Sequence, residues 1–311
     1  MESHKITIIS NHTQESLRNL CSQISSENSD TISNISDEIL SNVIQKSNSS
    51  GKESIHKKIE SIIVQKSRGL PQAERKLIRR AVVAKMALGL PAVIEKLNLP
   101  KSILDLYPGA FDRLVRHLST NINDAYDITD DFFRKDIDFV MGLSVPCGTP
   151  VVDLRSKILI RSVLRSLFRP GNLMAILRYI GVGVTGTWFC IHTESRNLSD
   201  FNEQGWDECY YRIAELLERR KTVRGVFGTS WFYDPQLLTI SPHLVYLRRR
   251  PLERGAFFIR HGSSQVDIER ATVKSKTRRD LYKEGKYKPV TYSLIWPREA
   301  IISWAQSQRR D

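Results

Sequence analysis

Between Thr187 and Gln308 the chain alternates apolar runs of strand length with segments of helical periodicity, and this alternation constrains the fold more than any other feature. The expected strands are Thr187–Thr193, Val223–Phe232, Ala256–Arg260 and Val290–Trp296, and the expected helices are Phe201–Arg220, Pro235–Leu247 (interrupted at Pro242), Val266–Lys283 and Arg298–Gln308. Such alternation predicts an α/β fold class with helices covering a sheet. We therefore expect residues 181–311 to form a C-terminal α/β domain.

Residues 1–70 have the composition of a disordered or weakly helical leader. Residues 22–54 include eleven serines, four asparagines and no aromatic residue. A segment of this kind buries too little apolar surface to offset the entropy that it loses on ordering. Apolar residues at positions 32, 35, 39, 40, 43 and 44 would still line one side of a helix.

Residues 71–180 are expected to form a helical middle domain, because apolar residues recur there at intervals of three and four. The expected helices lie within Gln72–Asn98, Ile103–Leu118, Asp131–Met141 and Asp153–Arg169. In the last of these, Lys157, Arg161, Arg165 and Arg169 recur at every fourth position. Like charges at this spacing disfavour an isolated helix, so the row predicts either an anionic partner or carboxylates supplied from elsewhere in the fold.

The net charge of +13 is concentrated in two basic blocks. Residues 241–311 hold 16 Lys/Arg against 7 Asp/Glu, and residues 151–190 hold six basic residues against Asp153 alone. Concentrated positive charge attracts the phosphates of nucleic acid, lipid headgroups or a cofactor. The stretch from Arg278 to Tyr292 also interleaves basic and aromatic residues, which suits single-stranded nucleic acid. The alternative is a solvated basic surface that binds nothing specific.

The four cysteines form no C-x-x-C pair, and none has a histidine at zinc-ligand spacing. We interpret them as reduced thiols and expect no metal and no tightly bound cofactor. Residues 1–10 lack the pattern of a signal peptide, and the most apolar stretch, Gly171–Cys190, is interrupted by Arg178 and several glycines. The sequence therefore predicts a cytoplasmic protein without a transmembrane segment.

Polar side chains follow the first two expected strands of the C-terminal domain. His192 and Glu194 come at the end of one strand, and Ser230 and Asp234 at the end of the next. If these strands are parallel neighbours, the four side chains meet beyond the carboxyl ends of the strands, where open α/β sheets form sites. His192 would then be the general base, because its ordinary pKa lies near neutral pH. The alternative is that Asp234 only caps the next helix and that His192 is packed.

A glycine-containing segment offers a possible phosphate site. Arg178, Gly181 and Gly183 match R-x-x-G-x-G, the pyrophosphate loop with which GNAT-type acetyltransferases hold coenzyme A. Glycines allow backbone N–H groups to approach phosphate oxygens. That loop normally follows a strand and opens a helix, whereas here it follows an expected helix and precedes an expected strand. A second segment, Arg260-His261-Gly262, lacks the downstream histidine that phosphatase chemistry of the histidine type would need.

The segment Ser230–Leu237 (S-W-F-Y-D-P-Q-L), preceded by Ile191-His192 and the Phe201–Arg220 helix, resembles the GNAT-like C-terminal domain of some bacterial acyltransferases. The resemblance covers roughly residues 187–296. It implies an acyl-CoA as co-substrate, catalytic residues His192, Ser230 and Asp234, and a substrate pocket shaped by Glu194, Trp231 and His243. The phosphates of the donor would meet Arg178, Gly181, Gly183, Arg260 and Arg270. The S-N-I and L-Q-R segments of that family are absent, which bears on the activity more than on the fold.

Two functions of different classes follow from these patterns. The first is an acyltransferase-like enzyme that uses an acyl-CoA donor on a small-molecule acceptor. The second is a non-catalytic protein that binds nucleic acid or an anionic membrane through the basic blocks at residues 151–190 and 241–311.

Overall fold

The structure is a computed structural model that describes residues 11–27, 30–46, 52–120, 126, 131–158, 163, 165–167, 169, 171–183 and 186–308. The chain divides into two compact units, Met1–Pro146 and Cys147–Asp311. The boundaries expected at residues 70 and 180 both lie inside a unit. Among the described residues, every helix is too short or too polar to cross a lipid bilayer.

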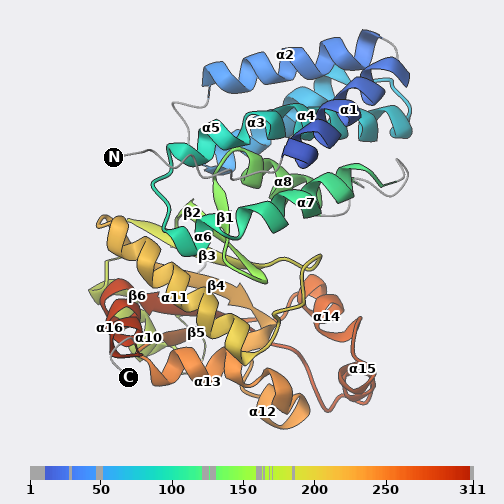
Figure 1. Ribbon diagram of the computed structural model, residues 1–311. Coiled ribbons are helices and arrows are strands. Elements are labelled where there is room, and N and C mark those ends of the chain that lie inside the picture. The colour runs from blue at the N-terminus through green and yellow to red at the C-terminus, as the bar shows by residue number, and fades with distance from the viewer. Residues whose placement is uncertain are drawn as a thin grey trace, which may run out of the picture. The chain divides into compact units, whose positions relative to one another are not determined.

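The first unit is built from helices around one central helix (Figure 1). Its elements are α1 (Asn11–Glu27), α2 (Asp30–Lys46), α3 (Lys52–Lys66), α4 (Gln72–Leu88), α5 (Leu90–Glu95), α6 (Lys101–Leu104), α7 (Tyr107–Leu118), α8 (Phe132–Val140) and the short strand β1 (Ser144–Pro146). Helix α4 contacts α1, α2, α3, α7 and α8. It is central because apolar residues along most of its length, including Ile78 and Val82, are buried against these neighbours.

The described part of the expected leader forms α1, α2 and α3, which pack within the first unit. Leu17, Ile39 and Ile63, one from each helix, are fully buried. Polar contacts add to this packing, since Lys85 Nζ lies 2.7 Å from Asp37 Oδ1. The helix expected from the apolar spacing is therefore present as α2, and its apolar side gains a partner in α4. The disorder expected for this region falls partly on residues 1–10, 28–29 and 47–51, which lie outside the described residues.

The second unit contains a mixed sheet with helices on both faces. Its elements are β2 (Pro150–Ser156), α10 (Leu173–Gly181), β3 (Thr187–Thr193), α11 (Glu203–Arg219), β4 (Val223–Ser230), the 3-10 turn η1 (Trp231–Tyr233), α12 (Leu237–Ile240), η2 (Pro242–Leu244), α13 (Tyr246–Glu253), β5 (Phe257–Gly262), α14 (Gln265–Thr272), α15 (Lys276–Lys283), β6 (Thr291–Pro297) and α16 (Arg298–Gln308). Within this unit the strand order is β2-β3-β4-β6-β5. Strands β3 and β4 are parallel, whereas the β2–β3, β4–β6 and β5–β6 pairs are antiparallel. The α/β class expected from the alternation is confirmed.

The two faces of this sheet differ in what covers them. Trp188, Ile259 and Ile295 belong to one buried cluster with Ile176 and Tyr179 from the α10 segment, so we call this side the α10 face. Successive residues of a strand point to opposite faces. Trp296 accordingly lies on the other side, where its ring is 5.0 Å from that of Tyr210 of α11. We call that side the α11 face.

The helix expected at Asp153–Arg169 is wrong at its first residues. Pro150–Ser156 forms β2, which pairs antiparallel with β3. Val152 and Leu154 are buried in the sheet, and this burial outweighs the helical spacing of the charged residues that follow. Arg161 lies outside the described residues, so the charged row as a whole is not tested.

The helix expected at Val266–Lys283 is two helices, α14 and α15. Helix α14 starts with a capping box in which Ser264 and Asp267 exchange hydrogen bonds. The Ser275 side chain accepts a hydrogen bond from Arg278 N and starts α15. A side chain that caps a new helix competes with continuation of the previous one, so the segment breaks at this serine.

Candidate functional site

The first two predicted catalytic residues lie on parallel neighbouring strands, but on opposite faces of the sheet. Cys190 pairs with Phe227 in the β3–β4 ladder, so residues two positions further along each strand, His192 and Thr229, share the α10 face. Ser230 is the next residue along β4 and therefore points to the α11 face. The structure does not bring His192 and Ser230 together, because the β4 residue on the face of His192 is Thr229, one position before Ser230.

Ser230 and Asp234 make hydrogen bonds that shape the chain after β4. Ser230 Oγ accepts a hydrogen bond from Phe232 N and starts η1. The buried carboxylate of Asp234 accepts one hydrogen bond from Gln236 N and one from Val290 N, at 3.0 and 2.9 Å. Burial raises the pKa of Asp234, while the two backbone hydrogen bonds and nearby arginines oppose this. Asp234 thus joins the segment after β4 to the residue before β6, whereas α12, with Gln236 at its N-cap position, has no side-chain cap.

The three residues expected to shape a substrate pocket lie in separate places. Glu194 is buried and accepts hydrogen bonds from the backbone and guanidinium of Arg196. Trp231 is buried with the guanidinium of Arg278 4.7 Å above its ring. His243 is exposed on η2. Glu194 and Trp231 are thus each accounted for by a local contact with an arginine.

The five residues expected to hold a cofactor do not form one phosphate cradle. Arg178 and Gly181 belong to α10, and Gly183 follows it with a φ of 97°. The guanidinium of Arg178 stacks 4.7 Å from the Phe257 ring. Arg260 stands between Ile259 and His261 on β5 and points to the α11 face, whereas Arg270 lies on α14. The glycine segment ends α10 instead of opening a helix, so it lacks the helix N-terminus that a pyrophosphate loop of this kind uses.

A group of polar side chains crosses the α10 face at the carboxyl ends of β3 and β4. This polar row consists of Asp153, Cys190, His192, Thr229, Ser293, His261 and Ser166. The ladder between β3 and β4 ends at Cys190 and Phe227, although β3 continues to Thr193 and β4 to Ser230. The polar row therefore crosses the two parallel strands at and just beyond the last pair of this ladder.

On the β3 side of the polar row, His192 interacts with a carboxylate and a thiol. Its Nε2 lies 2.9 Å from Asp153 Oδ2, and a side-chain atom of Cys190 lies within 4.8 Å of both. The side chain of His192 is 39% exposed. Burial alone would lower the pKa of His192, but the charges and hydrogen bonds of Cys190 and Asp153 outweigh burial and raise it to about 10. A raised pKa favours the protonated ring, which suits His192 to donate a proton, whereas the sequence predicted a general base at this position.

On the β4 side, a chain of hydrogen bonds leads from an exposed hydroxyl to a second histidine. Thr229 Oγ1 and Ser293 Oγ lie 2.7 Å apart, and Ser293 Oγ lies 2.7 Å from His261 Nε2. The other ring nitrogen, Nδ1, lies 3.0 Å from Ser166 Oγ. Burial lowers the pKa of His261, with a weaker opposing effect from Asp267. His261 is thus neutral at physiological pH and can accept a proton.

The polar row combines these two histidines with opposite pKa shifts on one face of the sheet. Titratable groups whose pKa values are driven apart by their surroundings are suited to act as an acid and a base in one reaction. The arrangement can therefore donate a proton from the β3 side and accept one on the β4 side.

Comparison with known proteins gives no match. No family model, curated protein or solved structure is significantly similar to this chain. A function for the polar row must therefore be inferred from its geometry.

The polar row also contains a set of metal-ligand types that the cysteine spacing did not predict. Asp153, Cys190 and His192 offer an oxygen, a sulfur and a nitrogen, all within 4.8 Å of one another. Zinc accepts this combination of ligands. Cys190 and His192 reach the same face because they are two residues apart on one strand, and Asp153 joins them because it pairs with Cys190 across β2 and β3.

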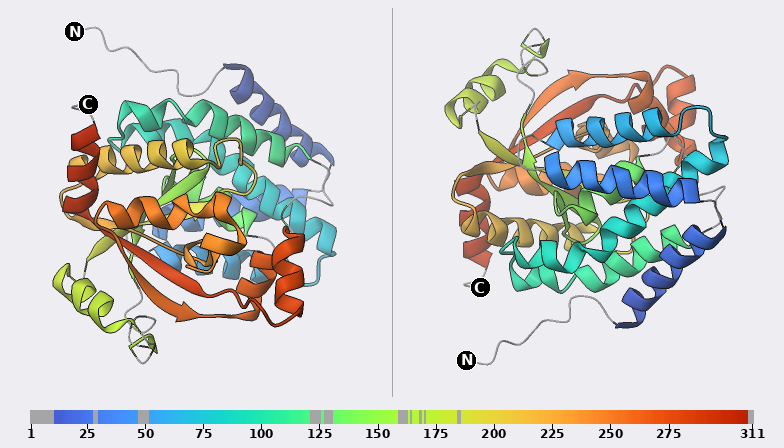
Figure 2. Two further views of the ribbon diagram at one scale, coloured as in Figure 1. Left: turned by 90° about the horizontal axis from the view of Figure 1, so that it is seen from below. Right: turned by 90° about the horizontal axis from the view of Figure 1, so that it is seen from above.

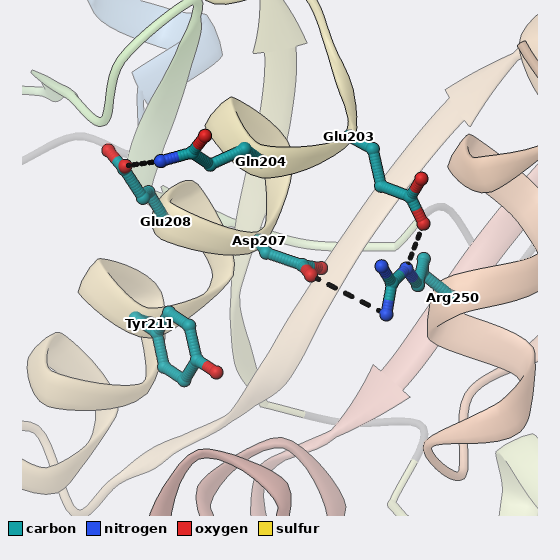
Figure 3. Close-up of a pocket in the computed structure, with 6 residues that line it drawn as sticks. All are labelled: Glu203, Gln204, Asp207, Glu208, Tyr211 and Arg250. Atoms are coloured by element: carbon teal, nitrogen blue, oxygen red, sulfur yellow. Dashed lines mark hydrogen bonds and ion pairs between the residues drawn. The ribbon is translucent and has the colours of Figure 1, made fainter. Parts of the chain in front are cut away.

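A pocket of about 500 Å³ lies elsewhere in the second unit, beside the first turns of α11 (Figure 3). Its lining residues are Glu203, Gln204, Asp207, Glu208, Tyr211 and Arg250. The four acidic and amide side chains come from α11. Carboxylates near the N-terminus of a helix interact favourably with the helix dipole, so the acidic residues of this pocket also stabilise α11.

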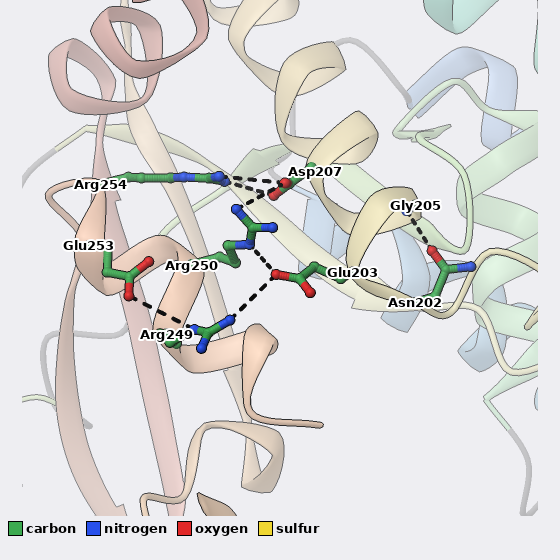
Figure 4. A network of polar contacts seen from close by, with 8 residues as sticks. All are labelled: Asn202, Glu203, Gly205, Asp207, Arg249, Arg250, Glu253 and Arg254. Carbon is green, nitrogen blue, oxygen red and sulfur yellow. Dashed lines mark hydrogen bonds and ion pairs between the residues drawn. The ribbon is translucent and has the colours of Figure 1, made fainter. Parts of the chain in front are cut away.

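Arginines from α13 neutralise the carboxylates of this pocket (Figure 4). Arg250 contacts both Glu203 and Asp207. Arg254 Nη1 donates to Asp207 Oδ1 at 2.7 Å, and Arg249 lies 3.6 Å from Glu203. These ion pairs join α11 to α13, so we assign the pocket a structural role and regard the polar row as the candidate site.

Proposed function

We propose that the chain is an acyltransferase that moves an acyl group from coenzyme A to a small-molecule acceptor at the polar row. The observation that carries this proposal is the pair of histidines with opposite pKa shifts, His192 and His261, on the same face of the sheet. Acyl transfer from a thioester needs a base for the incoming nucleophile and an acid for the outgoing thiolate.

Each step of the proposed reaction has a residue assigned to it. The acceptor gives its proton to Thr229 Oγ1, and the hydroxyls of Thr229 and Ser293 pass a proton to His261 Nε2. The acceptor attacks the thioester carbonyl, and the carbon–sulfur bond of the donor then breaks. The coenzyme A thiolate takes a proton from the imidazolium of His192, which Asp153 orients. One proton enters the protein and one leaves it, so the two histidines return to their starting states by exchange with water.

The end of the β3–β4 ladder supports a thioester donor. Beyond Cys190 and Phe227 the facing edges of the two strands are not joined in one ladder. The pantetheine arm of coenzyme A carries two amide groups, which can hydrogen-bond to strand backbone in the manner of an added strand. The resemblance of Ser230–Leu237 to bacterial acyltransferases points to the same donor. Ser230 and Asp234, in contrast, are assigned to shaping the chain after β4.

The test is thiol release from acyl-CoA esters, measured with full-length wild type and three histidine variants across a set of acceptor amines and alcohols. His192→Gln and His261→Gln should each lower kcat by about 10²–10⁴, the range for loss of a general acid or base. His243→Gln is the matched control, since this histidine is exposed on η2, and it should leave kcat unchanged. Wild-type rates retained by either of the first two variants would remove that histidine from the mechanism.

The non-catalytic alternative receives less support from the block at residues 241–311. Arg248 donates to Tyr233 O and stacks on the Phe258 ring, and Arg278 donates to Ala271 O and Ser241 Oγ. These arginines hold the fold together and leave fewer charges for an anionic partner. The absence of a thermal shift with any acyl-CoA, together with steeply salt-dependent binding to oligonucleotides, would favour the alternative.

A further inference from the structure

Helix α10 lies at the periphery of the second unit (Figure 2), and one of its sides carries exposed apolar residues. Four large apolar side chains on this helix are more than half exposed: Leu173 (62%), Met174 (68%), Leu177 (53%) and Ile180 (56%). The opposite side of the helix is buried through Ile176 and Tyr179. Helix α10 is therefore apolar on both sides, and the described residues cover only one of them.

The chain around α10 carries only positive charge. From Leu154 to Thr193 the sequence has six basic residues and no Asp or Glu. Of these, Arg165, Arg169 and Arg178 are exposed, and Leu167 beside them is 38% exposed. We define the α10 patch as Leu167, Leu173, Met174, Leu177 and Ile180 together with Arg165, Arg169 and Arg178.

We propose that the α10 patch docks on the surface of an anionic lipid bilayer. An amphipathic helix lies in the plane of a membrane when its apolar side chains enter the acyl boundary and basic residues meet the headgroups. Each arginine near an anionic surface strengthens binding by about fivefold. The patch combines both features, and its apolar residues would enter the bilayer from a helix already anchored on the sheet by Ile176 and Tyr179.

Other occupants fit this combination less well. A symmetric contact between two copies would bring the same arginines of both chains together, because an isologous interface pairs each patch with itself. Nucleic acid would satisfy the arginines but would leave exposed Leu, Met and Ile side chains with no partner. A bilayer with acidic headgroups supplies negative charge and an apolar phase at the same surface. This proposal does not depend on the chemistry of the polar row.

The test is co-sedimentation of the full-length protein with vesicles of phosphatidylcholine alone or with about 30% phosphatidylserine. Wild type should bind the anionic vesicles at least tenfold more tightly than the neutral ones, because three exposed arginines contribute. Leu173→Ser with Leu177→Ser should weaken binding by more than tenfold, and Arg165→Gln with Arg169→Gln by about fivefold for each arginine. All four side chains are exposed, so thermal melting should show unchanged folding.

Matched controls place the same changes elsewhere in the second unit. Leu238→Ser with Leu252→Ser removes leucines that are 54% and 49% exposed, and Lys274→Gln with Lys288→Gln removes two exposed lysines. Both control proteins should bind anionic vesicles as wild type does. Equal loss in the leucine controls and the α10 variants would overturn the proposal, and so would α10 variants that bind vesicles normally. Conversion of a dimer to a monomer by the leucine changes, with no vesicle binding in wild type, would also overturn it in favour of a second copy.

Discussion

Cys190 and Asp153 together raise the pKa of His192, and Asp153 contributes both a hydrogen bond and a negative charge. If Asp153→Asn removes this negative charge, the pKa of His192 should fall from about 10 by about 1–3 pH units, because burial then acts against fewer opposing interactions. Titration of the His192 ring protons by NMR measures the change. Asp200→Asn, at an exposed position, is the control and should leave the titration unaltered. A pKa that stays near 10 in Asp153→Asn would show that Cys190 alone sets the protonation state.

The same pKa shift makes the stability of the protein depend on pH in a defined direction. His192 has a pKa of about 10 in the folded chain, against about 6.5 for an unperturbed histidine in the unfolded chain. The folded state therefore binds the proton more tightly, and the stabilisation is complete below pH 6.5 and is lost as the pH rises toward 10. Urea unfolding of wild type and His192→Gln should show a difference in unfolding free energy that is larger at pH 6 than at pH 10. A difference that grows with pH would contradict the assignment.

At the scale of the single element, helix α11 depends on one side chain at its N-terminus. Asn202 Oδ1 accepts a hydrogen bond from Gly205 N at 2.9 Å. Asn202→Ala should lower the free energy of unfolding by about 1 kcal/mol, the usual cost of losing an N-cap. Asn202→Asp, which keeps an acceptor at this position, should retain most of the stability. Chemical denaturation measures both variants, and equal losses in the two would mean that the hydrogen bond is not what stabilises the helix.

Elements with a single strong signal could be predicted from the sequence. Thr187–Thr193 and Arg298–Gln308 have the bounds that were expected, because an uninterrupted apolar run and a proline before a helix are local signals. Strand β2 was missed, since charged residues at every fourth position suggested a helix there. Its true conformation depends on pairing with β3, which lies some forty residues further along the chain.

The candidate site was predicted only in part for a related reason. The strand that carries His192 was expected, and Cys190 shares its face because the two are separated by one residue. Asp153, His261 and Ser293 reach the site through the strand order β4-β6-β5 and the register of β2, which no local pattern determines. The choice of Ser230 failed by a single residue, since Thr229 is the β4 side chain that faces the same side as His192.

At the scale of the whole molecule, the net charge of +13 suggests nucleic-acid binding more strongly than the structure does. Many of the basic groups in residues 241–311 have partners within the protein. Arg254 pairs with Asp207, and Arg298 donates to backbone carbonyls at the C-terminal end of α11. Charges held in this way stabilise the fold and release few counterions on contact with phosphates. The salt dependence of any oligonucleotide binding should therefore be shallow for a chain of this charge.

Arg278 best distinguishes a basic residue that binds nucleic acid from one that stabilises the fold. It lies in the stretch that alternates basic and aromatic residues, and it is nevertheless buried. Its guanidinium donates to Ala271 O and Ser241 Oγ and stacks on Trp231. Arg278→Gln should lower the unfolding free energy by about 1.5–3 kcal/mol, the range for hydrogen bonds to charged groups. Its affinity for a single-stranded oligonucleotide should change less than twofold. Lys288→Gln, at an exposed position, should instead leave stability unchanged. If Arg278→Gln kept its stability and lost tenfold in affinity, the stretch from Arg278 to Tyr292 would be a binding surface.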